Sequence, residues 1–158
     1  MPRNYKSTSQ FLQADPKFGS VLATKIINKI MLDGKKSTAQ KVFYDAMDLA
    51  QRKLPDAKDQ EEIFTRAVDN VKPSVEVRSK RVGGANYQVP REVKRGRQLS
   101  LAIRWLIDNA RKKKGRPMAE RVAEEFIDAF NGTGTSVQWK ENVHKMAEAN
   151  KAYAHYAH

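Results

Sequence analysis

The sequence contains no cysteine, and this absence excludes several kinds of chemistry at once. Disulfide scaffolds, thiolate metal sites and cysteine nucleophiles all need that residue, and a chain without it suits a reducing cytosol. No apolar run approaches the ~20 residues of a membrane-spanning helix, and no apolar signal segment follows Met1. We therefore expect a protein that is neither secreted nor held in a membrane.

The sequence is also poor in residues arranged for catalysis or metal binding. The only imidazoles, His144, His155 and His158, have no ligand motif beside them, whereas a zinc site needs three or four placed ligands. The adjacent pairs Glu61-Glu62 and Glu124-Glu125 point to different helix faces and cannot converge on one bond. We expect solvated carboxylates at both pairs, no metal, no cofactor and no enzymatic activity.

Acidic residues are scarce relative to basic ones. The chain has 30 Lys and Arg against 18 Asp and Glu, for a net charge of +12. Such a charge indicates the kind of partner that the protein binds rather than its fold, and it favours a nucleic acid as that partner. The positive charge concentrates in residues 1–36, 72–97 and 111–121. With 158 residues, the chain is long enough for one domain with a core and too short to expect two. We expect residues 1–158 to form that single domain.

Residues 72–97 differ from everything around them. Val75, Val77 and Val82 lie in an extended, β-branched run, and Gly83-Gly84 supply a turn that tolerates positive φ. The extended pattern resumes until Pro90, which predicts a β-ribbon arm over residues 73–91. Eight basic and two acidic residues in 72–97 give +6, and because unpaired buried cations are too costly, the arm should project from the body.

Periodicity predicts six helices around this arm. After a basic tail at 1–14, they run from Ser20 to Gly34, from Lys35-Lys36 to about Lys53, from Asp59 to before Pro73, from about Gln98 to Ala110, from Pro117 to Phe130, and from about Val137 to a frayed end near Ala154. The fold class is thus mainly α, a six-helix bundle-like body with a protruding β-hairpin inserted between the third and fourth helices. Trp105 and Trp139 are expected to be packing anchors.

Residues 73–93, above all VRSKRVGGANYQVP at 77–90, resemble the signature of the family of small-subunit ribosomal protein seven. Residues 19–22, 27–36, 43–46 and 146–156 are similar to its bacterial form, so the resemblance covers nearly the whole chain. It implies a primary ribosomal RNA (rRNA)-binding protein that nucleates assembly of the head domain of the small subunit. It further implies a ribbon tip and C-terminal helix near the exit-site transfer RNA (tRNA), and contacts with small-subunit proteins nine and eleven. We expect no homo-oligomer and a cytoplasmic ribosome, with an organellar one left open.

The cation blocks indicate recognition of a phosphate backbone, and their replacement should weaken RNA binding with little loss of stability. The candidate rRNA-binding residues are Arg3, Lys6, Lys35, Lys36, Arg78, Lys80, Arg91, Lys94, Arg95, Arg97, Arg111, Lys112, Lys113, Lys114 and Arg116. From the resemblance, the candidate tRNA-proximal residues are Arg81, Val82, Gly83, Gly84, Ala85, Asn86, Asn150 and Tyr153. Tyr5, Tyr87, Tyr153 and Tyr156 could stack on unpaired bases or pack on the body.

Two other interpretations remain open. A DNA-bending architectural protein also uses a β-ribbon arm, but with a proline or large apolar wedge at its tip, where this chain has Gly83-Gly84-Ala85-Asn86. Alternatively, the charges on an exposed hairpin only discourage edge-to-edge aggregation. Eight cations exceed what that purpose needs, so nucleic-acid binding is favoured.

Overall fold

The computed structural model describes residues 8–157. Its elements are η1 (Thr8–Phe11), α1 (Val21–Ile30), α2 (Lys36–Lys53), α3 (Gln60–Val71), β1 (Val75–Val82), β2 (Ala85–Glu92), α4 (Arg95–Lys112), α5 (Met118–Phe130), α6 (Gly134–Ala149) and η2 (Lys151–Ala157). The expected mainly α fold, with a hairpin between the third and fourth helices, is confirmed. Over the described residues, no helix is long and apolar enough to cross a membrane.

A continuous apolar core joins the α-helices. Phe43 of α2, Phe64 of α3 and Phe126 of α5 are fully buried, with ring centroids of Phe43 and its two partners 5.7 and 6.5 Å apart. Helix α5 packs against α2, α3, α4 and α6, while α1 packs against α2 and α4. The body is therefore held mainly by apolar burial.

Local signals fix several helix ends. Asp59 accepts a hydrogen bond from the Glu62 backbone N–H at 2.7 Å, so it caps α3 as expected. Helix α1 stops at Ile30, before Gly34, and α4 begins at Arg95, three residues before Gln98. Both shifts lie in the frayed terminal turns, where periodicity is least informative.

The hairpin is an antiparallel ribbon in which Val82 lies opposite Ala85. Gly83 and Gly84 form its two-residue turn with φ values of 58° and 88°, a conformation that glycine adopts without steric cost. Strand β2 continues through Pro90 to Glu92, because every strand of a two-stranded sheet is an edge strand and tolerates proline. Val89 is fully buried and anchors the base of the ribbon.

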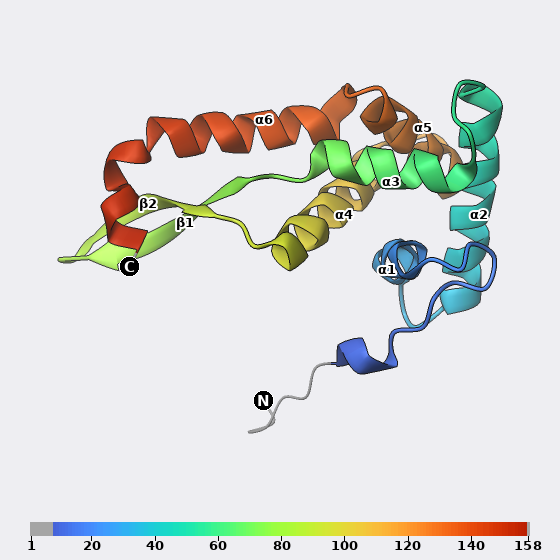
Figure 1. Cartoon of the computed structure of the whole chain (residues 1–158), viewed down its shortest axis with the longest axis horizontal. Helices are drawn as coiled ribbons and strands as arrows, with labels where there is room; N and C mark the ends of the chain where they lie inside the picture. The colour runs from blue at the N-terminus through green and yellow to red at the C-terminus, as the bar shows by residue number, and fades with distance from the viewer. Residues whose placement is uncertain (1–7, 158) are drawn as a thin grey trace.

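The ribbon extends away from the helical body alongside α6, and η2 folds back across it (Figure 1). On the other side of the molecule, residues before α1 are fixed to α2. The Asp15 carboxylate is buried and accepts a hydrogen bond from the Tyr44 hydroxyl at 2.7 Å. Burial and the adjacent Asp15 raise the pKa of Tyr44 to about 12. The part of the expected tail that is described, residues 8–14, thus includes a short 3-10 helix and leads into a fixed turn.

Candidate nucleic-acid interface

Two of the predicted cations, Lys80 and Arg97, hold the ribbon to neighbouring elements, and a third, Arg78, pairs within strand β1. Arg78 Nε lies 2.8 Å from Glu76 Oε1, and Arg97 Nη2, from α4, lies 3.2 Å from Glu76 Oε2. Lys80 Nζ donates to the Tyr156 carbonyl at 2.7 Å. The contacts of Arg97 and Lys80 join the ribbon to α4 and η2, whereas Arg78 keeps more than half of its side chain exposed.

Another set of predicted cations is exposed and marks two helix starts. Lys35 is the N-cap residue of α2 and Lys36 its first residue, while Lys94 and Arg95 hold the same positions in α4. Within residues 8–157, these four and Lys114 form no ion pair. Neither helix has an acidic residue in its first turn. Cations at the positive end of a helix dipole are unfavourable, and an anion at that position relieves this.

A shallow groove of about 350 Å³ between α1 and α4 adds basic residues that the sequence did not single out. Its polar lining comes from both helices, and Arg104 is exposed beside Ser100. The polar lining residues are Lys25, Asn28, Lys29, Ser100 and Arg104. Lys25 and Arg104 are isolated cations in the sequence, and only helix packing brings them together; their one sequence signal is their position off the apolar faces.

The basic run 111–116 covers the last two residues of α4 and most of the loop before α5, and it divides into structural and exposed cations. Arg111 Nη2 donates to the carbonyls of Lys29 and Ile30 at 3.0 and 3.1 Å, which caps the C-terminus of α1. Arg121 Nη1 donates to the Lys113 carbonyl at 2.7 Å and fixes the loop backbone. Lys112, Lys114 and Arg116 remain exposed. Arg111 therefore stabilises the fold, contrary to the expectation that its loss would leave stability unchanged.

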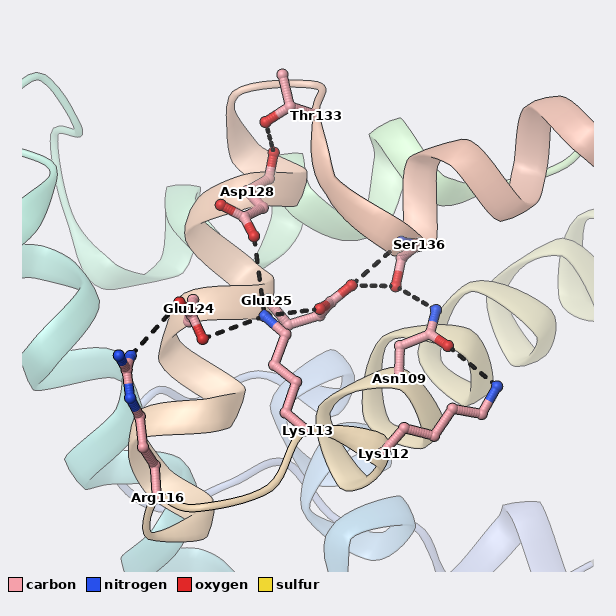
Figure 2. A network of polar contacts seen from close by, with 9 residues as sticks. All are labelled: Asn109, Lys112, Lys113, Arg116, Glu124, Glu125, Asp128, Thr133 and Ser136. Carbon is pink, nitrogen blue, oxygen red and sulfur yellow. Dashed lines mark hydrogen bonds and ion pairs between the residues drawn. The ribbon is translucent and has the colours of Figure 1, made fainter.

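Lys113 lies among three carboxylates, as Figure 2 shows. Its Nζ is 3.1 Å from Glu125 Oε2, 3.3 Å from Glu124 Oε2 and 3.8 Å from Asp128 Oδ2. Burial by itself lowers the pKa of Lys113, but the hydrogen bonds and charges of Glu125 and Glu124 outweigh it and raise that pKa. Lys113 therefore acts as the internal counter-ion of this acidic cluster.

Glu125 is only 1% exposed, so the expectation that it is solvated is wrong. Its Oε1 accepts hydrogen bonds from the backbone N–H and the hydroxyl of Ser136, at 3.1 and 2.6 Å. Asn109 Nδ2 donates to the same Ser136 hydroxyl at 3.0 Å (Figure 2). A buried carboxylate is retained where a cation and hydrogen-bond donors compensate its lost hydration, and this network ties α4, α5 and α6 together.

The C-terminal aromatic residues lie on the ribbon. The Tyr87 ring centroid is 5.2 Å from those of Tyr153 and Tyr156, so one predicted tRNA-proximal residue, Tyr153, contacts the strand that leads to the tip. Asn150 Nδ2 donates to the Met146 carbonyl and helps to end α6. Residues 81–86 form the far end of the ribbon (Figure 1).

The base of the ribbon meets α6 at a second groove, lined partly by Arg91 and His144. His144 Nε2 accepts a hydrogen bond from the Ser74 backbone N–H at 3.1 Å. Burial, followed by the charge of Lys140, lowers the pKa of His144. No group of three metal-ligating side chains occurs in the part of the chain that the structure describes. Arg3, Lys6 and Tyr5 lie outside that part.

Together, the fold and these exposed cations define a basic, α-rich protein with a β-ribbon arm. A family model described as ribosomal protein S7p/S5e matches residues 2–151. The chain belongs to this family, so the predicted membership is confirmed. The family consists of structural, non-enzymatic ribosomal proteins, and rRNA binding follows from membership.

Similar proteins come from several bacteria. The small ribosomal subunit protein uS7 of Fervidobacterium nodosum is 52% identical over 154 residues, covering 98% of both chains. The protein of the same name from Thermotoga maritima is 53% identical, again over 98% of both chains. That of Chloroflexus aurantiacus is 54% identical over 99% of this chain and 98% of its own. These relatives match the chain over almost its entire length.

Proposed function

We propose that this chain is a primary rRNA-binding protein that nucleates assembly of the head domain of the small ribosomal subunit, with residues 1–158 acting as a single rRNA-binding domain. The observation that carries the proposal is the pair of helix starts at Lys35-Lys36 and Lys94-Arg95, where cations replace the acids that favour a helix N-terminus. A phosphate at each start would satisfy free backbone N–H groups and the cations together.

The arrangement of these groups supports one continuous RNA contact. Helix α1 packs against both α2 and α4, and the starts of α2 and α4 lie along the same edge of the body as α1 (Figure 1). The groove with Lys25 and Arg104 lies between α1 and α4. A rigid helical surface of this kind recognises RNA by shape and by phosphate contacts.

The ribbon tip and η2 are proposed to contact the exit-site tRNA at the subunit interface. Tyr153 lies against Tyr87 on the ribbon, and the tip carries the exposed Arg81. Small tip residues permit a close approach to another backbone. The proposal also includes contacts with small-subunit proteins nine and eleven, as the family resemblance implies. It further includes a location in a cytoplasmic ribosome and no homo-oligomer. A DNA-bending role is disfavoured, because Gly83-Gly84-Ala85-Asn86 supplies no wedge.

Filter binding to head-domain rRNA, non-cognate RNA and duplex DNA at two salt concentrations tests the proposal. Lys94→Ala/Arg95→Ala should weaken binding to head-domain rRNA and lower the salt slope by about one unit for each phosphate that is no longer neutralised. The matched control is Lys53→Ala/Lys58→Ala, which removes the same charge from exposed residues at the opposite end of α2 (Figure 1). Equal reductions in affinity for both variants, or equal affinity for all three nucleic acids, would reject a specific RNA surface.

A further inference from the structure

Trp139 is an exposed aromatic residue beside Lys112 of the basic run 111–116, not the packing anchor that the sequence suggests. Its side chain lies in α6 and is 46% exposed. The Lys112 ammonium lies 5.3 Å from the centre of the indole ring, and Lys112 is the last residue of α4, at the start of the basic run 111–116. The fold thus places a large π surface next to a cation that is itself exposed.

The charges around the indole indicate what it binds. Residues 111–116 contain five cations and no acid, and Lys114 has no ion pair among the described residues. Apart from its position over the indole, Lys112 Nζ has a long contact of 3.5 Å to Asn109 Oδ1 (Figure 2), so it can turn to a new anionic partner. A nucleotide presents both complements at once, a base for the ring and a phosphate for the ammonium.

A docked protein is the competing occupant, because Met146 is 50% exposed two turns further along α6. However, Lys112 beside the indole and the exposed Lys114 form no ion pair among the described residues, and such uncompensated positive charge suits a polyanion better than the mixed rim of a protein interface. We propose that Trp139 is a stacking platform for an unpaired RNA base, with Lys112 contacting the phosphate of the same nucleotide. This inference rests on the proposed RNA-binding function and assigns it a base-stacking residue.

The inference predicts a reduction in affinity that differs from the effect of removing a charge. Trp139→Ala should weaken binding to head-domain rRNA roughly 5- to 100-fold, as removal of a stacked aromatic does, with an unchanged salt slope. Trp139→Phe should retain most of the affinity. Lys112→Ala should instead lower the salt slope by about one unit. The melting temperature of Trp139→Ala should stay close to that of the wild type, because the side chain is only half buried.

Fluorescence provides the second measurement, because Trp105 and Trp139 are the only tryptophans. A short oligoadenylate should quench wild-type emission and leave Trp139→Phe emission unchanged, while a fully paired RNA duplex should quench neither. If the wild type binds head-domain rRNA but Trp139→Ala binds equally well without differential quenching, the stacking site is wrong and the proposed function stands. If the wild type fails to bind RNA, both are wrong. A Trp139→Ala defect confined to assembly with other ribosomal proteins would assign the indole to a protein partner and overturn the inference.

Discussion

Replacing Lys113 with Met should destabilise the fold by about 2–3 kcal/mol. Removing one partner of a buried ion pair costs about 3–5 kcal/mol, because the other charge is left buried without compensation. Here the abandoned group is Glu125, which is 1% exposed. The lower figure allows for the 27% exposure of the Lys113 side chain and for its more exposed contacts with Glu124 and Asp128, since exposed pairs contribute little.

Urea denaturation at neutral pH measures this effect as a lower midpoint with an unchanged m-value. The corresponding drop in melting temperature is about 4–12 °C for a chain of this size. Lys114→Met is the matched control, because it removes the neighbouring exposed lysine and should change stability by less than about 0.5 kcal/mol. If the two variants are equally stable, Lys113 is not the counter-ion of Glu125 in solution.

A second change identifies the cause of the instability. In Lys113→Met/Glu125→Gln, the amide oxygen can still accept both hydrogen bonds from Ser136, while the unpaired buried charge is gone, so stability should partly return. The pH dependence gives an independent check. Because the pKa of Lys113 is raised from 10.5, its contribution is complete below pH 10.5 and is lost as the pH rises through the folded-state pKa. Additive single-variant effects would mean that the Lys113–Glu125 contact is not energetically coupled.

Three further predictions concern other parts of the molecule. The wild type should lose stability as the pH rises from 10.0 through about 12, as Tyr44 ionises, and the urea midpoint of Tyr44→Phe should fall less over this range, because only its Tyr44 contribution is removed while that of Lys113 is still lost. Because the pKa of His144 is lowered, the stability of the wild type should fall as the pH drops below 6.5. Thermal melts measure this fall, and an equally large fall in His144→Gln would contradict the prediction. Removing Arg81, Val82, Ala85 and Asn86 joins the paired Lys80 and Tyr87 through Gly83-Gly84, at little entropic cost. Subunits should still assemble but retain exit-site tRNA differently, and a block in head assembly would make the tip an rRNA contact.

The elements that can be predicted from sequence are those with local causes. The hairpin follows from β-branched residues around Gly83-Gly84, and the start of α3 follows from Asp59. The path of β2 beyond Pro90 does not follow from the sequence pattern, because proline usually ends a strand and only the two-stranded topology makes it harmless. Fold class is thus accessible from pattern alone, while element ends depend on tertiary context.

The roles of individual cations cannot be predicted in the same way, because their partners are distant in sequence. Arg111 and Lys114 belong to one basic run, yet Arg111 caps a helix 81 and 82 residues away and Lys114 is exposed. The prediction for Trp139 is wrong for a related reason. Helix α6 has a weak apolar pattern, with only Ser136, Val137 and Ala147 buried, so nothing local indicates which side faces solvent.

The same residue types perform opposite tasks at the two ends of the helices. At C-termini, Arg111 and Lys140 donate to the last carbonyls of α1 and α3, where a cation complements the helix dipole. At the starts of α2 and α4, exposed cations add to the positive end of a helix whose own first turn contains no acidic residue. The first arrangement stabilises the protein by itself, whereas the second becomes favourable only when an anion arrives. The position relative to a helix end therefore separates Arg111 and Lys140, which build this fold, from the exposed cations at the starts of α2 and α4, which are available to bind RNA.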